Sequence, residues 1–175
     1  MSGGSIIVLA LLIFAGVTIF KGVRIVPQGY KWIVQRLGKY HTTLTPGLNF
    51  VIPYVDEVAY KVTTKDIVMD IPSQEVITRD NAVLLMNAMA YINITTPEKA
   101  VYGIENYTWA IQNLVQTSLR SIVGEMDLDD ALSSRDHIKA KLKAAISDDI
   151  SDWGITLKTV EIQDIQPSST MQSAM

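Results

Sequence analysis

The feature that most constrains this chain is an uninterrupted apolar run near its amino terminus. Residues 5–20, SIIVLALLIFAGVTIF, contain no charged side chain, and Lys21 and Arg24 follow almost at once. An exposed apolar run of this length is insoluble in water, and nothing in the later sequence has the pattern of a groove that would cover it. The run is therefore predicted to be a membrane anchor that precedes a chain of ordinary globular composition.

The predicted anchor covers residues 1–22. As a helix, the apolar run reaches about 24 Å, whereas the hydrocarbon core of a bilayer is about 30 Å thick. We expect the apolar residues at 22, 23, 25 and 26 to extend the apolar path while the Lys21 ammonium reaches the headgroups. The side chains expected to face lipid are Ile6, Ile7, Val8, Leu9, Leu11, Leu12, Ile13, Phe14, Val17, Ile19 and Phe20.

Two other interpretations of the apolar run are a cleaved signal peptide and a re-entrant segment. A signal peptide normally begins with basic residues and ends in a small-x-small cleavage site. Residues 1–4 contain no Lys or Arg, and Ala15 with Gly16 matches the cleavage pattern poorly. An uncleaved anchor is therefore favoured, with re-entrant insertion as the remaining alternative.

Basic residues are concentrated on one side of the apolar run. Five of them, which are also candidate headgroup contacts, follow it closely: Lys21, Arg24, Lys31, Arg36 and Lys39. The positive-inside rule then predicts a single-pass protein with its amino terminus outside and its folded part in the cytosol. The chain has no cysteine, so it neither requires nor excludes an oxidising compartment.

The net charge of −3 conceals an asymmetry along the chain. Residues 1–65 carry seven Lys and Arg against two acidic residues, whereas residues 66–175 carry eight against sixteen. The basic part suits an anionic lipid surface, which attracts each nearby Lys or Arg by about 1 kcal/mol. A nucleic-acid partner is not expected, because the larger, acidic part lacks the basic face that phosphate binding needs.

Residues 30–95 have the pattern of strands joined by short turns. The predicted strands, rich in apolar and β-branched residues, cover 30–37, 48–52, 55–62, 66–78 and 82–95. Pro46 and Gly47 indicate a turn, because proline presets φ and glycine accepts a positive φ. Residues 79–81 indicate another turn, and Pro72 is expected to interrupt the fourth strand. This spacing predicts antiparallel pairing with short connections.

After residue 95 the apolar period lengthens from two to about four. Thr96 and Pro97 suit the start of a helix, and longer helices are predicted over 108–124 and 135–152. The residues expected to face the core are Ile111, Leu114, Val115, Ser118, Leu119, Ile122, Ile138, Leu142, Ile146 and Ile150. Gly154 then ends the last helix, and residues 156–165 alternate as a strand.

This order of elements predicts an α+β domain on a membrane stalk. Its β-rich half is expected over residues 23–95, and its helical half with a closing strand over 96–166.

No arrangement of side chains in the sequence indicates catalysis. The two histidines, His41 and His137, are far apart in the sequence. Ser133, Ser134 and Asp136 lie too close together for a nucleophile, a base and an orienting group supplied by separate elements. We therefore expect no catalytic residues and no enzymatic activity.

Metal and cofactor sites are not expected either. Asp127, Asp129 and Asp130 suggest calcium, but the segment lacks the spaced oxygen ligands and the central glycine of an EF-hand. A helix cap is the favoured interpretation. The sequence also has no His/Cys metal spacing and no Gly-rich phosphate loop. The Met-rich stretch at 86–89 is expected to be strand core.

Many short segments occur in the order typical of one known family. They are VPQGY at 26–30, RLGKY at 36–40, PGL at 46–48, IP at 52–53, DIPSQEVIT at 70–78, DN at 80–81, RSIVG at 120–124, LD at 128–129, SRD at 134–136, WGI at 153–155 and VEIQDI at 160–165. Residues 23–167 thereby resemble the SPFH (stomatin–prohibitin–flotillin–HflK/C), or band-seven, domain. Within that family they look most similar to the stomatin/paraslipin branch and the bacterial QmcA type.

Two features depart from this family pattern. Ser168 stands where the family commonly has a second proline. Family members also continue into a long coiled coil, of which residues 167–175 resemble only the cap and first turn. We therefore expect the chain to be a fragment of a longer protein.

The resemblance implies a non-enzymatic membrane scaffold whose subunits assemble side by side. Such a scaffold organises a membrane microdomain, or encloses and regulates membrane proteins such as an AAA protease. The resemblance further implies a homo-oligomer, weakened here by the missing coil, and a bacterial inner membrane. The alternative is a modulatory subunit that binds one membrane protease or channel in small complexes without forming a cage.

An apolar group follows the Pro46 turn. It consists of Leu48, Phe50, Val51 and Ile52. If these residues form a hairpin near the anchor, they can dip into the near leaflet and bind lipid. The alternative, an ordinary β-core, remains equally open from the sequence.

Overall fold

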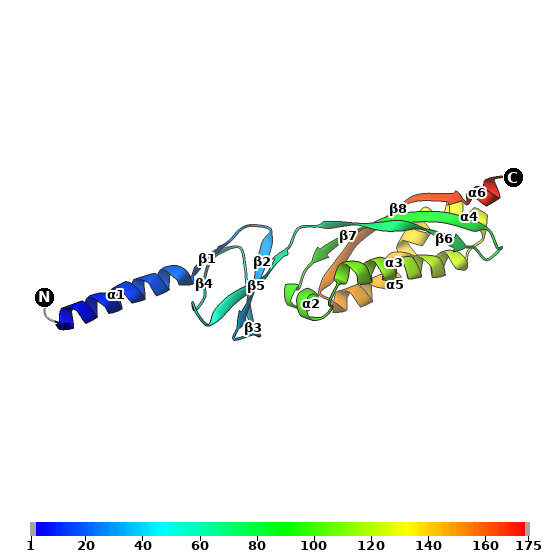
Figure 1. The fold of residues 1–175 in the computed structure, drawn as a ribbon. Helices are drawn as coiled ribbons and strands as arrows, with labels where there is room; N and C mark the ends of the chain where they lie inside the picture. The colour runs from blue at the N-terminus through cyan, green and yellow to red at the C-terminus, as the bar shows by residue number, and fades with distance from the viewer. Residues whose placement is uncertain (1–2, 174–175) are drawn as a thin grey trace. The chain divides into compact units, whose positions relative to one another are not determined.

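The computed structural model describes residues 3–173 (Figure 1). These residues form two compact units that divide between Thr64 and Lys65. The change from strands to helices comes later, at residues 95–96, where the sequence suggests the boundary between two halves. Two of the strands predicted for the first half, 66–78 and 82–95, therefore lie in the same unit as the helices.

The first unit begins with the helix α1 (Gly3–Gly22). Two small antiparallel sheets follow, one with the order β1–β4 and one with the order β3–β2–β5. The strands are β1 (Val23–Val26), β2 (Tyr30–Arg36), β3 (Lys39–Leu44), β4 (Gly47–Phe50) and β5 (Asp56–Thr63). Val26, Val34 and Leu44 form the core of this unit.

The end of α1 corrects one prediction. The twenty residues of α1 span about 30 Å, enough for a hydrocarbon core, but the helix stops at Gly22. Val23 to Val26 do not extend it, because their backbone groups pair with β4. The sequence also does not predict the strand β3, because Lys39–Leu44 is mostly polar and pairs with β2 only as an edge strand.

The second unit is built on the sheet β6–β7–β8, which is antiparallel throughout. Its strands are β6 (Ile67–Ile77), β7 (Val83–Ile94) and β8 (Ile155–Pro167). Along β7, alternate side chains are buried, which is the period that the sequence predicts. Pro72 does not end β6, because a bulge between Ile71 and Gln74 accommodates it.

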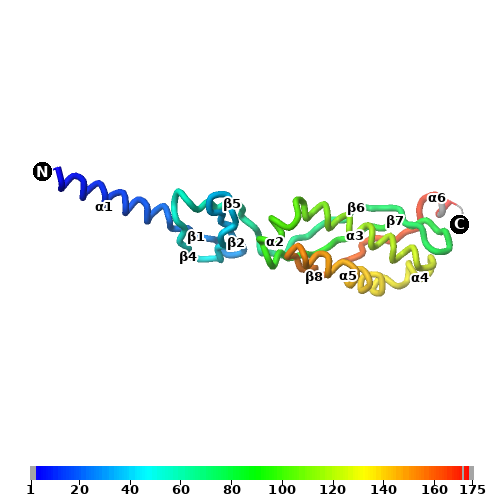
Figure 2. Tube along the Cα trace, turned by 90° about the horizontal axis from the view of Figure 1, so that it is seen from below, coloured from blue at the N-terminus to red at the C-terminus, as the bar shows by residue number. Residues whose placement is uncertain are grey.

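Helices cover one face of this sheet, and α3 packs beside α5 (Figures 1 and 2). The helices of the second unit are α2 (Pro97–Tyr102), α3 (Tyr107–Gly124), α4 (Leu128–Ser133), α5 (Arg135–Asp152) and, after β8, α6 (Ser169–Gln172). All four core residues predicted for α5 are buried. In α3 the prediction is confirmed at Ile111, Val115, Leu119 and Ile122, whereas Leu114 and Ser118 are only half-buried.

Gly154 forms the turn that returns the chain from α5 into β8. Its φ is +69°, and a Cβ there would lie 2.4 Å from the Thr96 carbonyl oxygen. The Thr95 and Thr96 amides both donate to the Gly154 carbonyl oxygen at 2.9 Å. This turn therefore requires glycine, both for the backbone conformation and for the close approach of the segment before α2.

The described chain closes with a helical turn. The Ser168 amide donates to the Val83 carbonyl oxygen, and the Gln172 amide donates to the Ser168 carbonyl oxygen. Ser168 thus lies where the predicted cap would be. Its continuation into a coiled coil stays a prediction.

Candidate membrane-contact site

Of the residues described, 3–173, α1 is the one helix long and apolar enough to cross a membrane. Its mean hydropathy reaches 2.5 over eighteen residues, and none of that window is buried. Every side chain predicted to face lipid is exposed. A signal sequence can also form an apolar helix of this length, so the helix alone does not distinguish an anchor from a signal sequence. The role of α1 therefore has to be inferred from the residues that follow it.

The strands β1 and β4 form a two-stranded ribbon with one apolar open face. Val23 pairs with Phe50 and Ile25 with Leu48, and because paired and alternate residues share a face, these four side chains lie on the same side. Ile25 is 70% exposed, Leu48 62% and Phe50 71%. We call these four residues the apolar ribbon.

The opposite face of β1 and β4 packs inward only in part, since Arg24 on that face is exposed. Val26 lies on that face and is buried in the core of the unit, where half-buried Val51 also packs. Leu48, Phe50 and Ile52 are therefore exposed rather than part of the core. They also do not belong to a hairpin, because β4 pairs with β1, which emerges directly from α1, and not with the strand that follows.

Residues 51–55 are fastened to the end of α1. The Val51 amide donates to the Gly22 carbonyl oxygen at 2.8 Å. A Cβ on Gly22 would lie 2.7 Å from the Val51 carbonyl oxygen, so only glycine permits this approach. Tyr54 has a φ of +72°, and the Lys21 Nζ lies 5.7 Å from the centre of its ring. The helix end and this loop therefore form one local structure.

Arg36 stabilises the same loop, so its guanidinium is engaged within the protein and does not point to a role in binding lipid headgroups. Its Nε donates to Asp56 Oδ1 at 2.7 Å and its NH2 to Oδ2 at 3.0 Å, while the Ile52 amide donates to Oδ2 at 2.9 Å. The Asp56 side chain is only 3% exposed. The Arg36 hydrogen bonds lower the pKa of Asp56 to about 2, so this carboxylate stays ionised at neutral pH.

The other predicted headgroup cations lie at three different places. Lys39 pairs with Arg36, so it lies at the end of the β3–β2–β5 sheet where Arg36 and Asp56 hold the loop of residues 51–55. Lys31 lies at the other end of β2, which is about 17 Å away. Lys21 and Arg24 lie at the end of α1, and within residues 3–173 no carboxylate pairs with either. Sequence order alone could not distinguish these positions.

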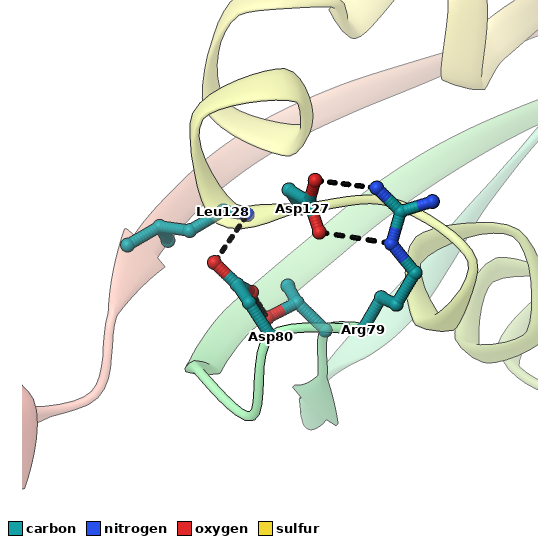
Figure 3. A network of polar contacts seen from close by, with 5 residues as sticks. Arg79, Asp80, Asp127 and Leu128 are labelled. Atoms are coloured by element: carbon teal, nitrogen blue, oxygen red, sulfur yellow. Dashed lines mark hydrogen bonds and ion pairs between the residues drawn. The ribbon is translucent and has the colours of Figure 1, made fainter.

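In the second unit, the predicted aspartate cap has a different partner. Asp127 precedes α4, but its carboxylate accepts from the Arg79 guanidinium, and Asp80 Oδ2 accepts from the Leu128 amide instead (Figure 3). The Thr78 hydroxyl also donates to Asp80 and lowers the pKa of that carboxyl. The turn between β6 and β7 is thereby linked to the start of α4.

The remaining candidates do not converge. His41 lies on β3 and His137 on α5, both exposed and in different units. Among residues 3–173, no group of three or more His, Cys, Asp or Glu is placed to hold a metal ion. Met86 is fully buried in the sheet, as predicted, whereas Met89 is half-buried and its sulfur lies 3.1 Å from the Gln163 amide nitrogen.

Comparison with known proteins identifies the family. The family model described as "SPFH domain / Band 7 family" matches residues 24–175. The chain belongs to this family. The SPFH match begins two residues after α1 ends, and it includes the part of the first unit from residue 24 onward and all of the second unit.

The relatives of this SPFH protein come from all domains of life. An uncharacterized protein of Methanocaldococcus jannaschii is 40% identical over 95% of this chain and 83% of its own length. An uncharacterized Mycobacterium tuberculosis protein is 35% identical over 98% of this chain and 45% of its own length. The mitochondrial stomatin-like protein 2 of Bos taurus is 37% identical over 86% of this chain and 42% of its own length. The chain thus spans less than half of the last two.

Family membership and an exposed apolar helix together support a membrane-associated role of the scaffold type. Only the β4 half of the apolar ribbon could be predicted from the sequence. The sequence indicates Leu48 and Phe50, but it predicts that Ile25 extends the anchor, because the pairing of β1 with β4 is not a local feature.

Proposed function

We propose that this SPFH protein is a non-enzymatic, single-pass membrane scaffold. Its folded part lies on the cytosolic leaflet, and its subunits assemble laterally to organise a membrane microdomain or to enclose and regulate membrane proteins such as an AAA protease. The observation that carries the proposal is the direct passage, without a linker, from the exposed helix α1 into the apolar ribbon.

The apolar ribbon suits the boundary between headgroups and acyl chains. Fully burying a Leu, Ile or Phe side chain contributes about 1.5–3 kcal/mol, so partial burial of Ile25, Leu48 and Phe50 contributes a few kcal/mol. α1 already holds these residues within reach of the leaflet. The ribbon therefore does not anchor the protein but sets how the folded part sits on the membrane.

Charge supports the cytosolic side. Lys21 lies in the last turn of α1, and Arg24 and Lys39 follow the helix, whereas residues 1–20 contain no Lys or Arg. The positive-inside rule then favours a cytosolic folded part, and anionic lipids favour contact with these three residues. Lys31 is left out of this set because of its place at the far end of β2.

Spin-label depth measurements test the ribbon, and the absence of cysteine makes each label unique. In the full chain in bilayers, nitroxides at Leu48→Cys and Phe50→Cys should be more accessible to oxygen than to a water-soluble nickel chelate. Phe50 should be the deeper by up to about 7 Å, because it lies two residues nearer the α1 end of the ribbon.

The control label is Gln28→Cys, in the exposed turn after β1. It should show the opposite accessibility, since β1 leads away from the end of α1. Water-like accessibility at both Leu48 and Phe50 would contradict the proposed seating of the ribbon in the leaflet.

Lateral assembly is tested by energy transfer between chains labelled at Glu105→Cys, an exposed position in the second unit. Anchors confine all subunits to one plane and raise their effective concentration. Transfer in vesicles should therefore exceed that of randomly distributed chains, and it should fall when the vesicles are dissolved in detergent. Transfer at the random level at every lipid-to-protein ratio would argue against self-assembly of this chain.

A further inference from the structure

A polar hollow lies in the first unit where α1, β1 and residues 51–55 meet. Its volume is about 450 Å³, and its lining includes Lys21, Arg24, Tyr54 and Asp56. Because α1 is the membrane helix of the proposed function, this hollow lies at the depth of the phospholipid headgroups.

The charge around the polar hollow is positive. Lys21 and Arg24 have no carboxylate partner within residues 3–173. Asp56 lines the same hollow, but Arg36 already neutralises it through two hydrogen bonds. An arginine fork and a lysine ammonium together are well suited to the oxygens of a phosphate.

Two apolar hollows adjoin the polar one. The first, of about 530 Å³, is lined by Phe20, Val23, Arg24, Ile25 and Trp32. The second, of about 240 Å³, lies on the other side, between the last turns of α1 and residues 50–53. The first shares Phe20, Val23 and Arg24 with the polar hollow, and the second shares Val51 and Pro53. A cationic centre between two apolar hollows has the pattern of a diacyl phospholipid.

We propose that this constellation is a binding site for one anionic glycerophospholipid of the leaflet on the folded side. Its phosphate binds Lys21 and Arg24 in the polar hollow, and its two acyl chains occupy the two apolar hollows, one beside β1 and Trp32 and the other against the last turns of α1. The proposal rests on the proposed function, because it requires α1 to lie in a bilayer. This site binds one lipid per chain, in addition to the diffuse attraction between basic residues and anionic headgroups.

Native mass spectrometry of the detergent-solubilised full chain tests this site. With phosphatidylglycerol, we expect one lipid adduct per chain, and with phosphatidylcholine of the same acyl chains, little adduct. The variant Lys21→Gln with Arg24→Gln should weaken phosphatidylglycerol binding by about tenfold or more, because it removes two charge-assisted contacts.

The matched control is Lys31→Gln with Lys141→Gln, which removes the same charge at positions that line none of the three hollows. This variant should keep the adduct within about twofold of the unmodified chain. Equal losses in the two double variants would overturn the site in favour of diffuse electrostatics. Equal binding of the two lipids would overturn it as well.

A third measurement, competition by inorganic phosphate, distinguishes a phospholipid ligand from free phosphate. Millimolar inorganic phosphate should not displace the phosphatidylglycerol adduct, because it offers nothing to the two apolar hollows. Full displacement, with no effect of acyl-chain length, would overturn the phospholipid assignment.

Failure of the site and failure of the proposed function are distinguishable. A lost adduct with deep labels at Leu48 and Phe50 would overturn the lipid site alone, whereas a retained adduct with labels in water would leave the lipid site standing and contradict the seating of the ribbon.

Discussion

Replacing Ile146 with Asp should unfold the unit that begins at Lys65. Ile146 is fully buried on α5, which packs against α3 and β8. An unpaired charge at such a position costs several kcal/mol, which is comparable to the total stability of a domain of about 5–15 kcal/mol. Circular dichroism of the full chain in detergent should show loss of the cooperative melt of this unit, while the α1 signal persists.

The control is Lys141→Ala on the same helix. Lys141 is exposed, and no described contact involves its side chain. Its removal should change the free energy of unfolding by no more than roughly 0.5 kcal/mol. Similar melts for the two variants would show that α5 presents a different face to the sheet.

Gly154→Ala should destabilise the second unit by about 2–4 kcal/mol. Part of this cost comes from placing a side chain at a positive φ, and part from the contact between the new Cβ and the Thr96 carbonyl oxygen. Chemical denaturation of the full chain would measure it as a lower midpoint with an unchanged slope.

Gly124→Ala provides the matched comparison for that prediction. Gly124 ends α3, and a Cβ there would meet only the Ile77 carbonyl oxygen at 3.7 Å, an ordinary contact. Alanine at this site should be neutral or should stabilise the unit by up to about 1 kcal/mol. If both glycine variants lower the midpoint equally, the tight turn at Gly154 is not the cause.

Elements with strong local periodicity could be predicted from the sequence. α5 repeats an isoleucine or leucine every four residues, and β7 alternates along its whole length, so each carries its own amphipathic pattern. The predicted breakpoints at Gly154 and at residues 79–81 are also local, because they depend on the φ angles that single residues allow.

Elements defined by their partners could not be predicted in this way. The Val23–Val26 segment continues the apolar run apart from Arg24, and only its pairing with β4 makes it a strand. Arg36 belongs to a row of basic residues in the sequence, yet Asp56, twenty residues later, turns it into a structural ion pair. Arg79 and Asp127 meet across 48 residues in the same manner.

The sequence by itself therefore determined that the chain has an apolar helix followed by an α+β domain of the SPFH family, because composition, periodicity and motif order are properties of the chain alone. The tertiary structure decided which residues meet at the end of that helix. It placed Leu48 and Phe50 beside Ile25, and it left Lys21 and Arg24 without carboxylate partners within residues 3–173 while pairing Arg36 with Asp56. The physical reason is that strand pairing and ion pairing depend on distance in space, which sequence separation does not report.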